Sequence, residues 1–192
     1  MGHYHNLNFQ TKGENIHGTE KKGGGTGQLT MPTVDTLVEE LKLIQNIGTR
    51  KISIIGTRNL SLMHQQLVEI LAYALVISGN IIITSGGASG VNSAVIKGAC
   101  RADQNKLEVL LPQTIGQQPT EVQNALIGIK GVFEHSERQN MTLADASRIC
   151  NREIVESSHQ LICFLYHDSH TLKEAIEYAH MQHKIVTVFY LD

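Results

Sequence analysis

The chain has 192 residues, the length of one domain and a tail, and 41% of them are hydrophobic, which is enough for a buried core. No run approaches the roughly 18 apolar residues of a membrane helix, and the polar N-terminus lacks the apolar part of a secretion signal. We therefore expect a cytoplasmic protein with no membrane partner. The net charge of -2 gives no general attraction to nucleic acid, so any anion site must be local.

The residue types that carry metal sites and catalysis show no recognisable pattern. The three cysteines, Cys100, Cys150 and Cys163, lack CxxC spacing, so the sequence indicates neither a disulfide framework nor a zinc site. No Ser/His/Asp order and no HExxH motif appear either. We therefore expect no bound metal, no cofactor and no catalytic residue, and we favour a binding protein over an enzyme.

The N-terminal segment differs in composition from the rest of the chain. Residues 1–30 contain seven of the 17 glycines and few large apolar residues. Such a segment cannot bury enough surface to offset the entropy of ordering, so we expect a flexible tail at 1–30 and one folded domain at 31–192. Within that domain, Thr33 is expected to begin a helix that extends to about Asn46.

After residue 50, short apolar stretches alternate with amphipathic ones. The short stretches are apolar on both faces, which is typical of parallel strands covered by helices on both sides. The predicted fold class is therefore α/β, a Rossmann-like three-layer fold with a mostly parallel sheet and helices on both faces. The expected strands are 51–56, a strand from 81, 107–111, 132–133, 161–166 and 185–190. The expected helices are 61–79, one after the glycines at 86–90, 120–130, 141–158 and 171–182.

Several of these helices begin at capping residues. Ser61 and Thr142 each precede an amphipathic stretch, and Thr171 with Glu174 three residues later matches a capping box. The helix after Ser61 is expected to face the sheet with one apolar side, made of Leu67, Ile70, Leu71, Ala74 and Leu75.

Two glycine-rich turns follow strands and lead into helices. Ligands of an open parallel sheet bind outside the carboxyl ends of the strands, and both turns fall at that edge. Glycines there allow backbone amides to converge on a phosphate, and they equally allow a loop to pass close to a neighbouring strand. Arg58 can bind phosphate or pair with a surface acid. The candidate phosphate-binding residues are Gly56, Thr57, Arg58, Ser85, Gly86, Gly87, Ser89 and Gly90.

Asn151 and Arg152 are candidates for the same site from the helix at 141–158. An arginine can bind phosphate through two hydrogen bonds, and an asparagine side chain offers a donor and an acceptor to a sugar or a base. Arg152 and Arg148 can instead pair with Glu156 and other carboxylates along the helix. We expect Arg58 and Arg152 to face one pocket at the carboxyl ends of the strands.

Three motifs, in matching order and spacing, resemble the DNA-processing protein A (DprA/Smf) family. Residues 54–58, Ile-Ile-Gly-Thr-Arg, resemble its Gly-Ser-Arg motif, and residues 85–92 resemble its Ser-Gly-x-Ala-x-Gly-Ile-Asp loop. Residues 150–155 resemble its Arg-Asn-Arg-Ile-Ile segment. The sequence departs from the family at Asn92, where the family has Asp, and at Ile96, where it commonly has His.

The resemblance implies a Rossmann-like protein that binds single-stranded DNA and dimerises. The residues that it implies around an anion pocket are Arg58, Ser85, Gly86, Gly87, Gly90, Asn151 and Arg152. We therefore expect a homodimer that binds single-stranded DNA or another phosphate-bearing nucleotide, in DNA processing or recombination. One alternative is a nucleoside monophosphate hydrolase similar to the LOG phosphoribohydrolases, acting through Glu174 and Arg152, although the glycines of their Gly-Gly-x-Gly-Thr-x-x-Glu motif are missing. Another is a partner-binding protein whose pocket has lapsed.

Overall fold

The computed structural model of the chain describes residues 49–87 and 89–191. The predicted tail at 1–30 and the predicted helix from Thr33 to Asn46 lie outside these residues, so both stay predictions. Every strand predicted after residue 50 is present, with ends that agree to within one residue. None of the helices in the described part has the length and apolar character that crossing a membrane requires.

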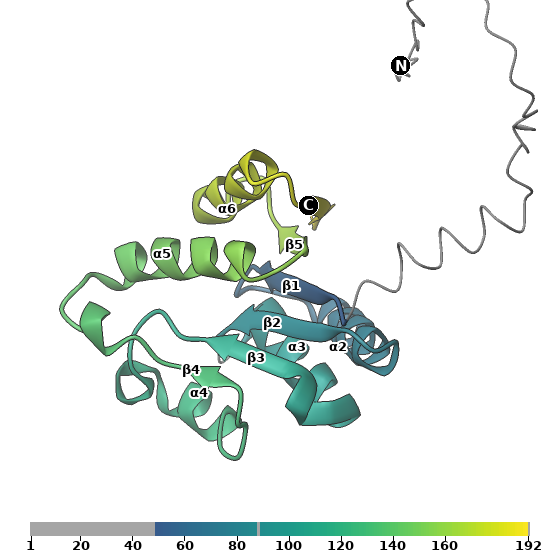
Figure 1. Cartoon of the computed structure of the whole chain (residues 1–192), viewed down its shortest axis with the longest axis horizontal. Coiled ribbons are helices and arrows are strands. Elements are labelled where there is room, and N and C mark those ends of the chain that lie inside the picture. The colour runs from purple at the N-terminus through teal and green to yellow at the C-terminus, as the bar shows by residue number, and fades with distance from the viewer. Residues whose placement is uncertain (1–48, 88, 192) are drawn as a thin grey trace, which may run out of the picture. The chain divides into compact units, whose positions relative to one another are not determined.

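In the described part of the chain, the strands form one sheet of six in the order β4-β3-β2-β1-β5-β6 (Figure 1). Each pair of neighbours is parallel. The chain moves outward from β1 to β4 and then returns to the other side of β1 for β5, so the strand order reverses at β1. The strands are β1 (Lys51–Gly56), β2 (Ile81–Ser85), β3 (Leu107–Leu110), β4 (Val132–Phe133), β5 (Gln160–Leu165) and β6 (Ile185–Tyr190).

Helices cover both faces of the sheet and create two apolar cores (Figure 1). The first core joins α2 (Leu62–Ile77) and α3 (Gly90–Asp103) to strand residues such as Ile54. The second joins α5 (Leu143–Glu156) and α6 (His170–Met181) to residues such as Ile55. Because successive strand residues point to opposite faces, each central strand is buried on both sides. The predicted three-layer α/β fold is confirmed.

The side of α2 that faces the sheet differs from the prediction. Leu67 and Ile70 are 57% and 58% exposed, while Leu71 and Leu75 are half-buried. The helix is apolar around most of its circumference, so periodicity alone could not identify the inner side. The residues that it buries are Val68, Ala72 and Val76. We call the exposed apolar residues at helical spacing the outer stripe of α2, and they are Met63, Leu67, Ile70 and Ile77.

Candidate functional site

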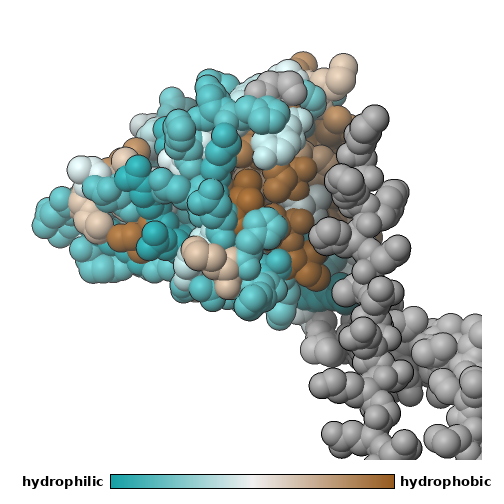
Figure 2. Space-filling view, turned by 90° about the horizontal axis from the view of Figure 1, so that it is seen from above, coloured by the Kyte–Doolittle hydropathy of each residue, from teal (hydrophilic) through white to brown (hydrophobic). Residues whose placement is uncertain are grey.

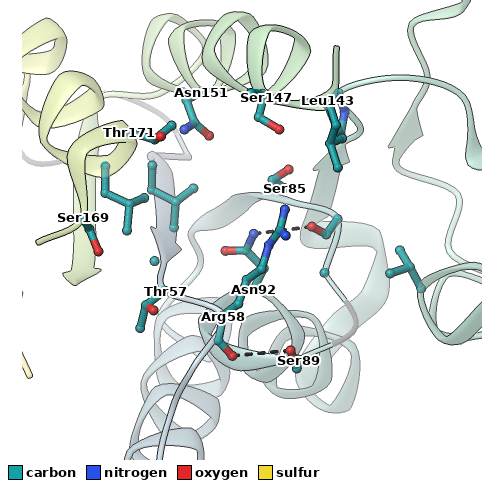
Figure 3. A pocket seen from close by; sticks show the side chains of 18 of the residues that line it. Thr57, Arg58, Ser85, Ser89, Asn92, Leu143, Ser147, Asn151, Ser169 and Thr171 are labelled. Carbon is teal, nitrogen blue, oxygen red and sulfur yellow. Dashed lines mark hydrogen bonds between the residues drawn. The ribbon is translucent and has the colours of Figure 1, made fainter. Parts of the chain in front are cut away.

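A cavity of about 740 Å³ opens at the carboxyl ends of the strands (Figure 3). Its walls come from the end of β1, the loop after β2, the segment around the start of α4 (Thr120–Ala125), one side of α5 and the start of α6. It lies beside β1, where the strand order reverses, and this is the place where the topology predicts a ligand. In Figure 3, Ser147 and Asn151 of α5 face Arg58 and Asn92 across the open space.

Most of the predicted binding residues line this cavity. Parallel strands end at the same edge of a sheet, so the turns after β1 and β2 meet there although 30 residues separate them along the chain. Gly90 and Arg152 are not among the lining residues. The predicted residues that line the cavity are Gly56, Thr57, Arg58, Ser85, Gly86, Gly87, Ser89 and Asn151.

Gly90 holds the two glycine turns together instead of lining the cavity. Its φ is +71°, and a Cβ at this position would lie 2.2 Å from the Thr57 carbonyl oxygen and 2.5 Å from the Arg58 Cα atom. A Cβ on Gly56 would similarly lie 2.4 Å from the Phe164 carbonyl oxygen. Of the two interpretations of the glycines, close passage of the backbone therefore applies to Gly56 and Gly90.

Arg58 supplies the positive charge of the cavity. Among the described lining residues it is the only arginine or lysine, and its guanidinium forms no ion pair with any other described residue. The helices α3 and α6 also begin at the cavity, and their N-cap residues, Ser89 and Ser169, form no side-chain capping bond. Helix N-termini carry a partial positive charge. The electrostatics therefore suit one phosphate group.

Asn92 adds a hydrogen-bond acceptor that is not satisfied within the described residues. Its Oδ1 atom is buried without a partner there, and its Nδ2 atom donates a long bond of 3.5 Å to the Gly86 carbonyl oxygen. A buried acceptor of this kind is normally paired, so a donor from water or from a ligand base or sugar would complete it. Because an asparagine stands here and not an aspartate, the cavity gains no negative charge.

Arg152 points away from the cavity toward α6. Its guanidinium carbon lies 5.5 Å from the centre of the Tyr178 ring, a cation–π contact. Arg152 lines a small neighbouring cavity that shares only Asn151 and Thr171 with the large one. The predicted meeting of Arg58 and Arg152 in one pocket is therefore not found in the structure, whereas Asn151 does face the large cavity.

Glu174 is engaged in an ion pair. Its Oε2 atom lies 3.2 Å from Nε of Arg148, and Arg148 also contacts Asp145 at 3.2 Å. The predicted capping box is wrong, because α6 begins at His170 and its N-cap is Ser169, two residues before Thr171. Ser61 and Thr142, in contrast, accept the capping hydrogen bonds predicted for them.

The thiol of Cys150, which lies behind the cavity, is unreactive. Cys150 is fully buried, and burial raises its pKa to about 12, although a contact of 3.9 Å with Ser85 Oγ acts in the opposite direction. Burial likewise raises the pKa of Cys163 to about 12, which fits its predicted role as a small core residue. Neither thiol is a nucleophile near neutral pH, because the thiolate is the reactive form.

Some lining residues were missed by reasoning from motifs alone. Leu143, Ser147 and Asn151 follow one another at four-residue spacing on α5 and face the cavity together. That spacing is visible in the sequence and could have extended the site from Asn151 to Ser147. Gln118 comes from the irregular segment after β3, and no sequence signal identifies it.

Comparison with known families identifies the chain. Residues 40–152, more than half of the chain, match the family model of DNA recombination-mediator protein A. The chain belongs to this family. The match includes both glycine turns and ends at Arg152, so it covers most of the cavity walls. A comparison with curated proteins gives no match.

Solved structures of low sequence identity share the fold. DNA processing protein A from Helicobacter pylori, which binds single-stranded DNA, matches with a TM-score of 0.61 and 24% identity over 77% of this chain and 67% of that chain. The molybdenum cofactor binding protein from Rippkaea orientalis matches with a TM-score of 0.57 and 17% identity over 76% of this chain and 79% of that chain. One fold thus carries different ligands, so the site must decide the function.

Proposed function

We propose that this member of the recombination-mediator family binds single-stranded DNA and takes one phosphate-bearing nucleotide into the cavity at the carboxyl ends of β1 and β2. The observation that carries the proposal is the placement of Arg58, a cation without an ion pair among the described residues, beside the glycine turns and the start of α3. A volume of about 740 Å³ lies within the range of about 300–1,000 Å³ typical of ligand pockets, so there is room for a nucleotide as well as its phosphate. The protein acts in DNA processing in the cytoplasm.

Arg58→Ala is expected to weaken binding of a fluorescein-labelled 20-mer of deoxythymidine by about tenfold or more, because a hydrogen bond to a charged group contributes about 1.5–3 kcal/mol. Fluorescence anisotropy across a salt series measures the effect. One cation at the cavity neutralises few phosphates, so the log–log salt slope of the wild type should be shallower than about -3.

The matched control for this experiment is Arg101→Ala. Arg101 is exposed near the end of α3, pairs with Glu69, and does not line the cavity. Its replacement should leave the affinity unchanged. Tight binding with a steep salt slope that survives Arg58→Ala would place the DNA on another surface and refute the cavity as the site.

We also propose that the protein is a homodimer, and the outer stripe of α2 is the surface that we assign to the contact. Ile70→Lys should convert the dimer to a monomer in light scattering after gel filtration, because a lysine within an apolar helix contact would be desolvated. Ile127→Lys is the control, because Ile127 is 78% exposed on the segment after α4, away from the stripe. A wild-type chain that stays monomeric at micromolar concentration contradicts the proposal.

A further inference from the structure

We propose that the stacked rings of His167 and Tyr190 are a platform on which a base of the bound strand stacks, an inference that rests on the proposed binding of single-stranded DNA. The two ring centres are 4.1 Å apart and the ring planes differ by 8°. Both side chains are exposed, Tyr190 to 51%. A nucleic-acid base is also a planar ring, so it can stack on such a pair as a third ring.

The cavity itself offers no stacked ring pair, and the one aromatic side chain among its described lining residues is the imidazole of His170. No phenylalanine, tyrosine or tryptophan occurs among its described lining residues, and the whole chain has no tryptophan. Proteins that bind single strands without sequence preference combine a site for the backbone with aromatic rings for the bases. The cavity around Arg58 therefore has a single imidazole for stacking among its described lining residues, and a larger ring surface for the bases beyond the cavity lies elsewhere on the same edge of the sheet.

The position of the ring pair meets this requirement. Tyr190 ends β6 and lies opposite Leu165, the last residue of β5, so it reaches the same carboxyl edge as the cavity. His167 lies two residues before Ser169, which lines the cavity, and two residues of extended chain span at most about 7 Å. A strand that leaves the cavity past the start of α6 therefore meets the platform within a short distance.

Phe164 and Phe189 form a second stacked pair that serves as a comparison. Their ring centres are 4.7 Å apart, Phe164 belongs to the first core, and Phe189 is 44% exposed. Because strand residues alternate between faces, Phe189 and Tyr190 point to opposite sides of the sheet. On the side of Tyr190, β6 packs through Val186 and Val188 on the α5–α6 core. Phe189 thus provides a matched aromatic that lies away from the platform.

Figure 2 shows the molecule from the side on which β6 forms the edge of the sheet. On this side of the molecule, apolar side chains gather in one region next to hydrophilic ones, so a ligand there would meet both kinds of surface. Nucleic acid suits such a surface, because its bases are flat and weakly polar while its backbone needs water and cations.

The first test introduces a fluorescent reporter into a chain that has no tryptophan. Tyr190→Trp should bind the 20-mer of deoxythymidine, and its indole fluorescence should be quenched on saturation, because a base stacks on the ring. A 20-mer made of abasic deoxyribose phosphates should not quench it. Phe189→Trp should show no quenching with either strand. Equal quenching of both reporters, or none with Tyr190→Trp at saturation, overturns the platform.

The second test measures affinity and separates the platform from the proposed function. Tyr190→Leu should weaken binding of the thymidine 20-mer by about fivefold or more, the effect of losing one stacked base, and should leave binding of the abasic strand unchanged. Phe189→Leu should change neither, and thermal melting verifies that both variants fold. If Arg58→Ala abolishes binding and Tyr190→Leu has no effect, the platform is wrong and the cavity stands. If the wild type binds no single strand, the proposed function itself fails.

Discussion

Replacing Gly98 by alanine is expected to lower the melting temperature of the protein by about 5–10 °C. Gly98 lies where α3 crosses α2, and a Cβ there would sit 2.1 Å from the Glu69 carbonyl oxygen and 3.1 Å from the Ala72 Cβ. The Glu69 oxygen belongs to the backbone of α2, and the Ala72 Cβ is bonded directly to that backbone. Neither atom can therefore move without displacing α2. Overpacking of this kind costs about 1–3 kcal/mol, and each kcal/mol shifts the melting temperature of a domain of this size by about 2–4 °C.

Gly116→Ala is the matched control for this prediction. No atom lies within 4 Å of the Cβ position at Gly116, and its φ is not positive. Alanine there restricts the unfolded chain without a clash, so stability should be unchanged or slightly higher. Calorimetry measures both melting temperatures. If Gly98→Ala lowers the melting temperature no more than Gly116→Ala does, α2 and α3 separate easily and the close backbone contact at Gly98 contributes little.

The strands could be predicted well because each is a short apolar run bounded by glycine or polar residues. Ile81–Ser85, for example, follows Gly79 and precedes Gly86, and both limits fix its length. The inner side of α2 could not be predicted, because residues such as Leu67 and Val68 are equally apolar and adjacent. Which of the two is buried depends on how the helix lies on the sheet, and local sequence does not contain that information.

Some residues of the candidate site could likewise be predicted from the sequence, and others could not. Both glycine turns lie at the cavity because the parallel topology alone brings them together, so Arg58 and Ser85 follow from the fold. Asn151 and Arg152 are consecutive on a helix, and consecutive side chains point about 100° apart. They therefore cannot both face one cavity squarely, and the motif match gave no means of choosing between them. Arg152 makes a cation–π contact with Tyr178, and the packing of α5 on α6 determines this contact.

The ring pair of His167 and Tyr190 is invisible to sequence reasoning for another reason. The two residues are 23 positions apart in the chain and meet only because β5 and β6 pair with Leu165 opposite Tyr190. A slip of one residue in that register would send Tyr190 to the other face of the sheet. The predicted strand at 185–190 already places Tyr190 at a carboxyl end, but its stacking on His167 depends on the pairing and register of β5 with β6, which only the folded chain provides.

The ion pair of Arg138 and Glu153 fixes α5 against the rest of the domain. Arg138 is only 8% exposed, and its Nη1 atom donates to Oε2 of Glu153 at 2.8 Å while Nη2 donates to the other carboxylate oxygen. The backbone oxygen of Arg138 also accepts a bond of 3.1 Å from the buried amide of Gln113. Hydrogen bonding to Glu153 raises the pKa of Arg138, so the guanidinium stays charged. The pair thus links the segment after β4 to the helix that carries Ser147 and Asn151.

Arg138→Met is expected to destabilise the protein by about 2–3 kcal/mol, a fall of about 5–10 °C in melting temperature, because the half-buried Glu153 carboxylate would lose both hydrogen bonds from Arg138 and keep only the contact of 3.4 Å with His135 Nε2. The double variant Arg138→Met/Glu153→Met should recover part of the loss, since the half-buried carboxylate of Glu153 is then removed together with its arginine. Arg101→Met is the matched control: its pair with Glu69 has Arg101 60% exposed and should contribute less than about 1 kcal/mol. Calorimetry on the four proteins decides the matter. If Arg138→Met costs no more than Arg101→Met, the position of α5 depends on its apolar contacts with the second core and not on this ion pair.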